Sequence, residues 1–306
     1  MTAEQLVRPI DMSARYGDGI GVGLSLGGGG VWFVAWQVAY LFELSRSGID
    51  LAGADRVVGT SAGSVVASVL EAGNLGRMHA EMRVLARVPK VVGALAPAGA
   101  LAPSQERARD LFGVAPDASP ERIREIGHAA LAAATPAPSV MSRNVSVILA
   151  SRGWPSEALH VTCVDAYSGE RCVVTKASRV PVGRAVAASS AVPGLFAPQP
   201  IQDRRCMDGG VSGTGTHLDL LAGARRAVVL GLTDGADVEE GRMTVAPGST
   251  LRELDELRNT GTEVVFRMPE EVDIDRLMDP TAVPEAIEMA RRQAAKDAEP
   301  LREFLA

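Results

Sequence analysis

The chain is poor in aromatic residues and in cysteine. Aromatic residues make up 4% of its 306 residues, and its three cysteines are Cys163, Cys172 and Cys206. An odd number of cysteines without the spacing of metal ligands predicts neither a disulfide framework nor a metal site. Cys163 and Cys172 fall on neighbouring predicted strands, so we expect reduced core cysteines, which are typical of cytoplasmic proteins.

Long apolar runs and an excess of positive charge are also missing from the sequence. No stretch reaches the roughly 20 apolar residues of a transmembrane helix, and residues 1–9 lack the apolar core of a secretory signal. The net charge of −6 argues against a nucleic-acid partner and against electrostatic attraction to anionic membranes. The composition thus favours a cytoplasmic location, allows transient contact with a membrane surface, and leaves the oligomeric state open.

The sequence does contain many aliphatic residues, in alternating strand-like and helix-like segments. Hydrophobic residues make up 46% of the chain, and buried aliphatic runs are typical of parallel strands. The predicted strands are 19–26, 54–59, 145–150, 159–165, 171–175, 226–232 and 262–267. The predicted helices are 31–46, 62–72, 75–87, 104–112, 120–133, 183–191, 216–223, 249–260 and 283–304. This alternation predicts a three-layer α/β/α sandwich with a mostly parallel central sheet.

We expect a single domain over residues 1–306, interrupted by one insertion. Residues 88–145 are rich in proline and alanine and break the alternation. They predict a helical, proline-rich insertion, which either covers the mouth of a site as a lid or packs as a loop on the edge of the core.

Ser61 lies in the motif Gly59-Thr-Ser-Ala-Gly63, between a strand-like run and an apolar helix. A strand that turns directly into a helix holds the corner residue in a tight bend, and small neighbours let the adjacent backbones pass. The hydroxyl then projects at a helix N-terminus, whose partial positive charge favours a developing anion. With 32 glycines in the chain the motif can arise by chance in a loop, but its context favours a nucleophilic serine.

A glycine loop, Gly27–Gly30, forms a second cluster between a predicted strand and a predicted helix. Successive backbone N–H groups in such a loop can hold an anion, either a nucleotide phosphate or the oxyanion of an acyl-transfer intermediate. The lysine of a phosphate-binding loop is absent, because Val31 and Trp32 follow the glycines, although Asp50 lies at the distance that a dinucleotide fold requires. A third interpretation is a loop that only permits close packing of helix on sheet.

Asp208 belongs to a third cluster, Met207-Asp-Gly-Gly-Val211, which by itself indicates a turn. Upstream lies a small-residue helix that ends in Ala188-Ser-Ser-Ala-Val-Pro-Gly-Leu-Phe196. A glycine loop, Gly-Thr-Ser-Ala-Gly, this segment and Asp-Gly-Gly, in that order, resemble the motifs of the patatin-like phospholipases. The resemblance extends over about residues 19–232.

The resemblance implies a patatin-like fold and a lipid acyl hydrolase with a Ser-Asp dyad that needs no cofactor or metal. It implies that Ser61 is the nucleophile and Asp208 the general base. The implied oxyanion hole is the glycine loop, which consists of Gly27, Gly28, Gly29 and Gly30. Such a dyad is chemically coherent, because a serine hydroxyl attacks well only when a base takes its proton. The expected partner is a lipid or another acyl-ester substrate.

The chain departs from the family at the end of the glycine loop. A basic residue and a further glycine are usual there, and Val31 and Trp32 take their places. Backbone donors need no side chain, so the oxyanion hole is expected to survive. An uncharged and bulky entrance suits a neutral ester, or a different acyl donor, better than an anionic phospholipid.

Three alternatives remain open on the sequence. His217 is the only histidine beyond Asp208 and would complete a Ser-His-Asp triad, although the start of the predicted helix 216–223 favours an N-terminal or surface role. The altered glycine loop also fits a catalytically silent relative that binds an acyl group or a protein partner. An acyltransferase would share the first half-reaction with a hydrolase.

Overall fold

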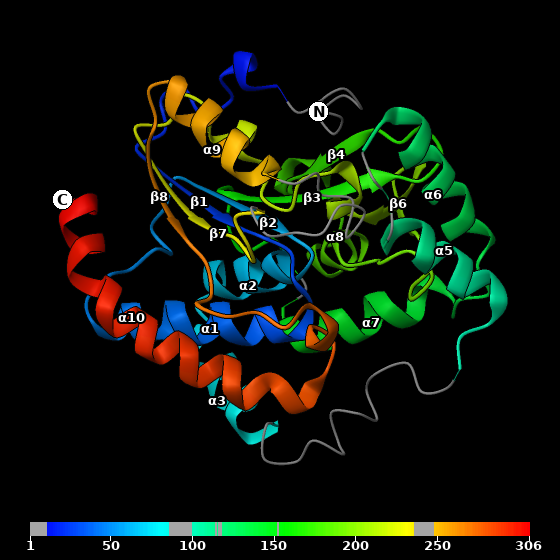
Figure 1. Cartoon of the computed structure of the whole chain (residues 1–306), viewed down its shortest axis with the longest axis horizontal. Helices are drawn as coiled ribbons and strands as arrows, with labels where there is room; N and C mark the ends of the chain where they lie inside the picture. The colour runs from blue at the N-terminus through cyan, green and yellow to red at the C-terminus, as the bar shows by residue number, and fades with distance from the viewer. Residues whose placement is uncertain (1–10, 86–99, 114, 116–117, 152, 236–247) are drawn as a thin grey trace.

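The structure is a computed structural model, which describes residues 11–306 except 86–99, 114, 116–117, 152 and 236–247 (Figure 1). The strands are β1 (Val22–Leu26), β2 (Arg56–Thr60), β3 (Leu159–Asp165), β4 (Arg171–Val174), β5 (Gln199–Ile201), β6 (Arg204–Asp208), β7 (Arg226–Leu230) and β8 (Glu263–Arg267). The α-helices are α1 (Gly30–Arg46), α2 (Ala62–Glu71), α3 (Leu75–Leu85), α5 (Pro103–Gly113), α6 (Pro120–Ala132), α7 (Pro138–Leu149), α8 (Val182–Ser189), α9 (Ser249–Asn259) and α10 (Val283–Leu305). Short 3-10 helices are η2 (Met12–Ala14), η3 (Lys176–Ser178), η4 (Gly209–Ser212), η5 (Leu218–Leu221), η6 (Ile274–Arg276) and η7 (Pro280–Ala282).

The strands form one eight-stranded sheet in the order β5-β6-β3-β2-β1-β7-β8, with β4 paired to β3 beside this path. Strands β1, β2, β3, β7 and β8 pair in parallel with one another. Strands β4, β5 and β6 add antiparallel pairs at the β3 end. The predicted sandwich with a mostly parallel central sheet is therefore confirmed.

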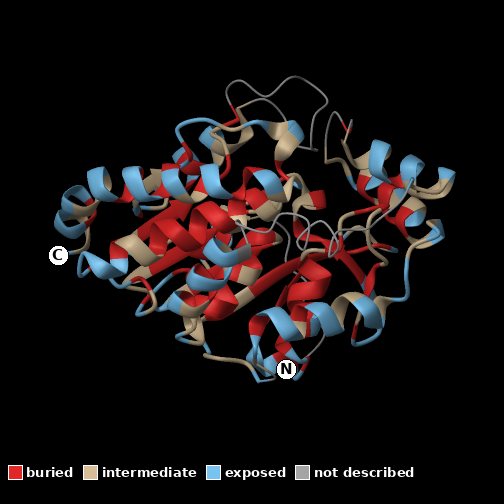
Figure 2. Ribbon diagram, turned by 90° about the horizontal axis from the view of Figure 1, so that it is seen from below, coloured by how far each residue is buried: buried red, intermediate tan, exposed pale blue. Residues whose placement is uncertain are grey.

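Helices cover both faces of the sheet, and the buried apolar residues divide accordingly. The larger core cluster joins one face of the sheet to α1, α2, α3, α7, α8 and α10, which lie on the same side in Figure 1. A second cluster joins the opposite face to α9 and η5, and a third joins the end of the sheet near β3 and β6 to α6. In Figure 2 the sheet is buried, and the outer helices are exposed only on their outward sides.

Two strand ends meet beside β3. Strand β2 runs parallel to β3 and ends at Thr60, which pairs with Thr162. Strand β6 runs antiparallel to β3 and ends at Asp208, which pairs with Cys163. Strand β4 pairs with residues 161–164 and so occupies the other edge of β3, which leaves β2 and β6 on a common edge. The carboxyl ends of β2 and β6 therefore converge at neighbouring residues of β3.

Three expectations about individual elements are wrong. The predicted strand 145–150 lies in α7, where Val145 and Leu149 are buried four residues apart, as on one helix face. The predicted helix 216–223 contains only the 3-10 helix η5. Strands β5 and β6 were not predicted, because β5 has three residues and includes Pro200, and β6 begins with two arginines.

The described part of the predicted insertion is helical. It consists of α5, α6 and the first part of α7, and α5 packs beside α6. Residues 86–99, which contain the apolar part of the predicted lid, lie outside the described residues. The assignment of this region as a separate insertion remains a prediction.

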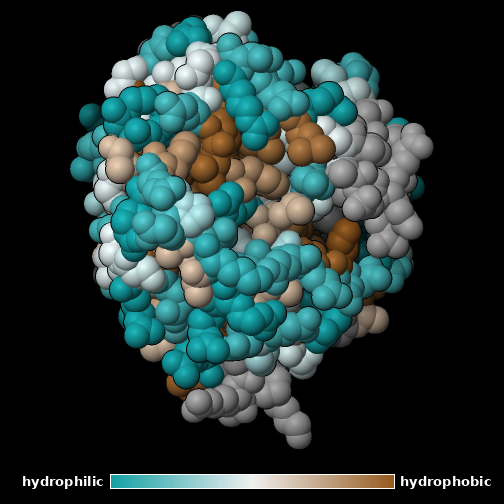
Figure 3. All heavy atoms as spheres, turned by 60° about the vertical axis from the view of Figure 1, so that its left-hand side comes forward, coloured by the Kyte–Doolittle hydropathy of each residue, from teal (hydrophilic) through white to brown (hydrophobic). Residues whose placement is uncertain are grey.

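The sheet ends at β8, whose residues are half-buried or exposed. Figure 3 brings this side of the molecule forward and shows a mostly hydrophilic surface with apolar atoms gathered in hollows. In the residues that the structure describes, we find no helix whose length and apolar content would allow it to cross a bilayer.

Candidate active site

Ser61 occupies the corner between β2 and α2. Its φ and ψ are 50° and −119°, a backbone region that residues other than glycine rarely adopt and that costs about 1–3 kcal/mol. Strand β2 ends at Thr60 and α2 begins at Ala62, so a single residue makes the turn. The sequence predicted this strand, sharp turn and helix, and the structure contains them.

The glycines on either side of Ser61 permit close backbone packing. A β-carbon built on Gly63 would lie 1.9 Å from the carbonyl oxygen of Leu26, and one built on Gly59 would lie 2.7 Å from Cα of Ser64. The Gly63 amide donates to the carbonyl of Gly27 over 3.1 Å. The start of α2 is therefore fastened to the start of the glycine loop.

Two serines from the end of α8 hold the backbone of Ser61. The Ser61 amide donates to Oγ of Ser189 over 2.8 Å, and the hydroxyl of Ser190 donates to the Ser61 carbonyl over 3.2 Å. The Ser64 hydroxyl donates to the same carbonyl over 2.7 Å. In the sequence, Ser189 and Ser190 stand out only as part of a family motif, and nothing there indicates their role. These contacts hold the turn at Ser61 in its strained conformation.

Asp208 lies at the end of β6 with 3% of its surface exposed. Its Oδ1 accepts a hydrogen bond of 2.8 Å from the Gly210 amide. Burial raises the pKa of Asp208 to about 6, and the Ser61 hydroxyl and the Gly210 amide partly offset this rise. Oδ2 has no partner with hydrogen-bond geometry among the described residues, so no hydrogen bond joins it to the Ser61 hydroxyl in this structure. An unpartnered, buried carboxylate oxygen is suited to accept a proton.

The glycine loop lies directly beside Ser61. A β-carbon built on Gly28 would lie 3.2 Å from Cβ and 4.0 Å from Oγ of Ser61, so a side chain at this position would crowd the hydroxyl. The Gly27 amide donates to Leu230 and the Gly28 amide to Gly215, over 2.9 Å and 3.3 Å.

The amides of Gly29 and Gly30 differ from those of Gly27 and Gly28, which donate to backbone carbonyls. The amides of Gly29 and Gly30, at the start of α1, have no acceptor within the described part of the chain. The loop therefore offers two unoccupied donors, Gly29 and Gly30, at a helix N-terminus.

A half-buried carboxyl group supports the segment that contacts Gly28. The hydroxyl of Thr214 donates to Oε2 of Glu253 in α9 over 2.8 Å, and its Oγ1 accepts from the Thr216 amide over 3.2 Å. Burial raises the pKa of Glu253 to about 7, and hydrogen bonds from both threonines oppose this. Nothing in the sequence distinguishes Glu253 from other acids on a helix surface.

Trp32 does not form part of an open entrance, which corrects one expectation. Its side chain is 4% exposed and belongs to the larger core cluster, and its amide donates to the carbonyl of Leu277 over 3.0 Å. Val31 is half-buried and packs against the same cluster. The Trp32 side chain therefore fills the core under α1. Val31 alone takes the place of the basic residue that is usual after the glycine loop.

His217 precedes η5 as its N-cap, as an N-terminal role predicts, but it is fully buried, so the expected surface role is wrong. Its Nδ1 lies 3.3 Å from Nη1 of Arg171, whose guanidinium forms an ion pair of 2.6 Å with Asp219. Burial and the neighbouring Arg171 charge hold the pKa of His217 well below its usual range. This ring is engaged in a buried polar cluster around Arg171 rather than with Asp208.

Among 11 chains of solved structures that match this one, two illustrate the similarity. They are VipD from Legionella pneumophila, with a TM-score of 0.41 and 13% identity over 88% of this chain, and the type III effector protein ExoU, with a TM-score of 0.32 and 16% identity over 89%. The chain spans 66% of the length of the VipD chain and 53% of that of the ExoU chain. No curated protein matches the sequence.

A family profile covers the whole of the candidate site. The profile described as "Patatin-like phospholipase" matches residues 24–219, from β1 to η5, which is more than half of the chain. This range contains the glycine loop, the turn at Ser61, the serines at the end of α8 and Asp208. The chain belongs to the patatin-like phospholipase family.

Proposed function

We propose that the protein is a serine acyl hydrolase that cleaves carboxylic esters of lipids, with Ser61 as nucleophile and Asp208 as base. Membership of the family supports lipid acyl hydrolysis in general. The observation that carries the specific proposal is the convergence of β2 and β6 at Thr162 and Cys163 of β3. That convergence joins the turn at Ser61 to the end of the strand that bears Asp208.

In the first half-reaction Oγ of Ser61 attacks the acyl carbonyl carbon of the ester, and Oδ2 of Asp208 takes the hydroxyl proton. The carbonyl oxygen becomes a negatively charged oxygen in the tetrahedral intermediate. The amides of Gly29 and Gly30, which have no acceptor among the described residues, are the donors proposed to stabilise it, and one such donor contributes about 3–4 kcal/mol. The carbon–oxygen bond to the alcohol then breaks, and the proton on Asp208 moves to the leaving alcohol.

In the second half-reaction water attacks the acyl group on Ser61. Asp208 takes a proton from this water and returns it to Oγ of Ser61 as the acyl–serine bond breaks, which releases a carboxylic acid. The raised pKa of Asp208 suits both steps, since a base that titrates near the working pH can accept and return a proton.

The buried cluster around His217 favours a dyad over a Ser-His-Asp triad. The His217 side chain is fully buried and its Nδ1 faces the Arg171 guanidinium, which holds a charge that opposes protonation of the ring. A general base must gain a proton during each turnover. His217 is poorly placed to do so, because its Nδ1 faces a cation and burial holds its pKa well below the usual range.

Labelling by a fluorophosphonate probe tests the proposal. Wild type is expected to react at Ser61, and Ser61→Ala not at all. Asp208→Asn is expected to react at least about 100-fold more slowly, because the hydroxyl proton has no acceptor. Labelling is followed by gel fluorescence and mass spectrometry of the peptide that contains Ser61.

A matched control is Asp203→Asn, which changes an exposed carboxylate in the turn between β5 and β6. This variant is expected to label like wild type. An unlabelled wild type would favour a catalytically silent relative, and equal labelling of Asp208→Asn and Asp203→Asn would remove Asp208 from the mechanism.

A further inference from the structure

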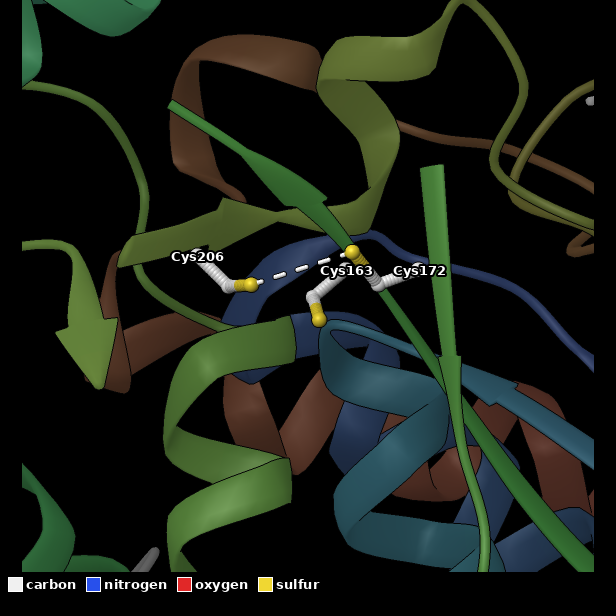
Figure 4. A group of neighbouring side chains, drawn as sticks. All are labelled: Cys163, Cys172 and Cys206. Carbon is white, nitrogen blue, oxygen red and sulfur yellow. Dashed lines mark hydrogen bonds between the residues drawn. The ribbon is translucent and has the colours of Figure 1, made fainter. Parts of the chain in front are cut away.

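All three cysteines of the chain converge on one point in the core. Cys163 lies on β3, Cys172 on β4 and Cys206 on β6. Their Sγ atoms all lie within 4.8 Å of one another, and those of Cys172 and Cys206 are 4.0 Å apart (Figure 4). Each side chain is fully buried. The chain has three cysteines among 306 residues, so composition alone does not explain why they converge.

The pairing of the strands fixes this arrangement. Cys163 is directly opposite Cys172 in the antiparallel pair of β3 and β4, so both side chains point to the same face. Cys206 pairs with Asp165 on the other edge of β3, two residues from Cys163, and so shares that face. The pairing of β3, β4 and β6 by itself therefore places the three sulfur atoms in a triangle.

We propose that Cys163, Cys172 and Cys206 form a trigonal thiolate site for a single Cu(I) ion. Three sulfurs bound at about 2.3 Å around a metal in their own plane are about 4.0 Å apart, as estimated from metal–thiolate bond lengths. The separation of 4.0 Å between Sγ of Cys172 and Sγ of Cys206 equals this value, and because no pair is more than 4.8 Å apart, only a small rotation of side chains is needed to complete the site.

The number and type of the ligands select the metal. Among the described residues, the group contains three sulfur ligands and no fourth histidine, cysteine or carboxylate. A structural zinc ion requires four ligands, whereas soft thiolates favour Cu(I). The nearby carboxylate of Asp165 is occupied, because it bonds to Arg204 and to the Ser168 hydroxyl.

Binding of the metal ion replaces the protons of the cysteine thiols. Each thiol that becomes a ligand releases its proton to solvent, and no electron is transferred. Arg204, two residues before Cys206 on β6, forms ion pairs with Asp165 over 3.2 Å and with Glu170 over 3.0 Å. The site does not depend on the proposed acyl hydrolysis, but it shares β3 and β6 with Asp208.

The test is a Cu(I) titration of the full chain, refolded under reducing and anaerobic conditions with a competing chelator. Refolding is used because the sulfurs are buried and an ion can reach them only while the sheet is open. We expect one Cu(I) per chain and a higher thermal midpoint. X-ray absorption of the loaded protein is expected to show three sulfur neighbours at about 2.3 Å.

Single replacements test the ligand set. Cys163→Ser, Cys172→Ser and Cys206→Ser are each expected to weaken Cu(I) binding at least about 100-fold. Val161→Ala and Val174→Ala serve as controls, because both residues are fully buried on β3 and β4 in the same core cluster and offer no ligand. These controls are expected to lose stability but retain Cu(I).

The proposal can be overturned with the wild-type protein alone, so it stays testable even where a variant does not fold. Absence of Cu(I) from refolded wild type would overturn the proposal. Two sulfur neighbours in place of three, or nitrogen and oxygen neighbours, would do the same. Labelling of Ser61 by the fluorophosphonate is measured on the same preparations, so a failed metal site and a failed nucleophile are told apart.

Discussion

At the scale of single residues, the candidate site depends on how the backbone of Ser61 is held. The positive φ of this residue is unfavourable by itself, and its amide has one acceptor among the described residues, Oγ of Ser189. Its carbonyl accepts from both Ser64 and Ser190. The two serines of α8 therefore make unequal contributions, although they are adjacent in the sequence.

We expect Ser189→Ala to slow fluorophosphonate labelling by about tenfold or more, since a buried amide without an acceptor costs about 1–3 kcal/mol. The inactivation rate constant should fall, while the concentration of probe at half-maximal rate should change little. Ser190→Ala is the matched comparison and should have a smaller effect, because Ser64 still donates to the Ser61 carbonyl. Equal losses in the two variants would contradict this assignment.

The pKa of Asp208 predicts the pH dependence of the reaction. Burial raises this pKa to about 6, and only the ionised carboxylate can take the Ser61 proton. The labelling rate should therefore rise with pH, reach half of its maximum near pH 6, and fall about tenfold per pH unit below that. Circular dichroism at each pH separates this effect from unfolding. A rate that stays constant down to the usual range of an exposed aspartate would contradict the prediction.

At the scale of elements, the site is made by contacts between the ends of β1, β2 and α2. The carbonyls of Leu26 and Gly27 lie against the first turn of α2, and Gly63 leaves no room for a side chain there. The same contact brings the glycine loop to Ser61. The motif Gly-x-Ser-x-Gly is thus a packing requirement as much as a chemical one.

We expect Gly63→Ala to destabilise the fold by at least about 3 kcal/mol, because its β-carbon would lie 1.9 Å from the carbonyl oxygen of Leu26 and the backbone would have to move. Urea unfolding followed by circular dichroism measures this. Gly53→Ala is the control, since a β-carbon there has nothing within 4 Å. Similar stability of the two variants would show that α2 can shift without cost.

At the scale of the whole molecule, net charge influences which surfaces the protein approaches. The net charge is −6, and Val31 takes the place of the basic residue that is usual beside the glycine loop. Negative proteins are repelled by anionic surfaces, and salt screens this repulsion.

Turnover of a neutral monoacyl ester is therefore expected to exceed turnover of an anionic phospholipid by about tenfold at low ionic strength. Added salt should narrow the difference. The variant Val31→Arg should gain relatively more on the anionic substrate, and comparison with Val31→Ala controls for side-chain size. A strong preference of wild type for the anionic lipid would refute this explanation.

The sequence by itself determined the features that depend on neighbouring residues. Alternating aliphatic segments predicted the sandwich and the mostly parallel sheet, because each segment shows the period of its own structure. The strand, turn and helix at Ser61 and the glycine loop before α1 were predicted for the same reason. The wrong prediction of a strand at 145–150 was also based on a local pattern, because its valines fit a strand. The structure instead places this segment in α7, with Val145 and Leu149 buried on one helix face.

Only the tertiary structure decided which distant residues meet. Strand β6 is short and begins with charge, so its pairing with β3 left no periodic signal, yet this pairing brings Asp208 to the end of β2. The contact between Ser61 and Ser189 spans 128 residues. The three cysteines, whose spacing predicts no site, share one face because β3, β4 and β6 are neighbours. Local propensity fixes how a segment folds, whereas the burial of shared apolar faces fixes which segments become neighbours.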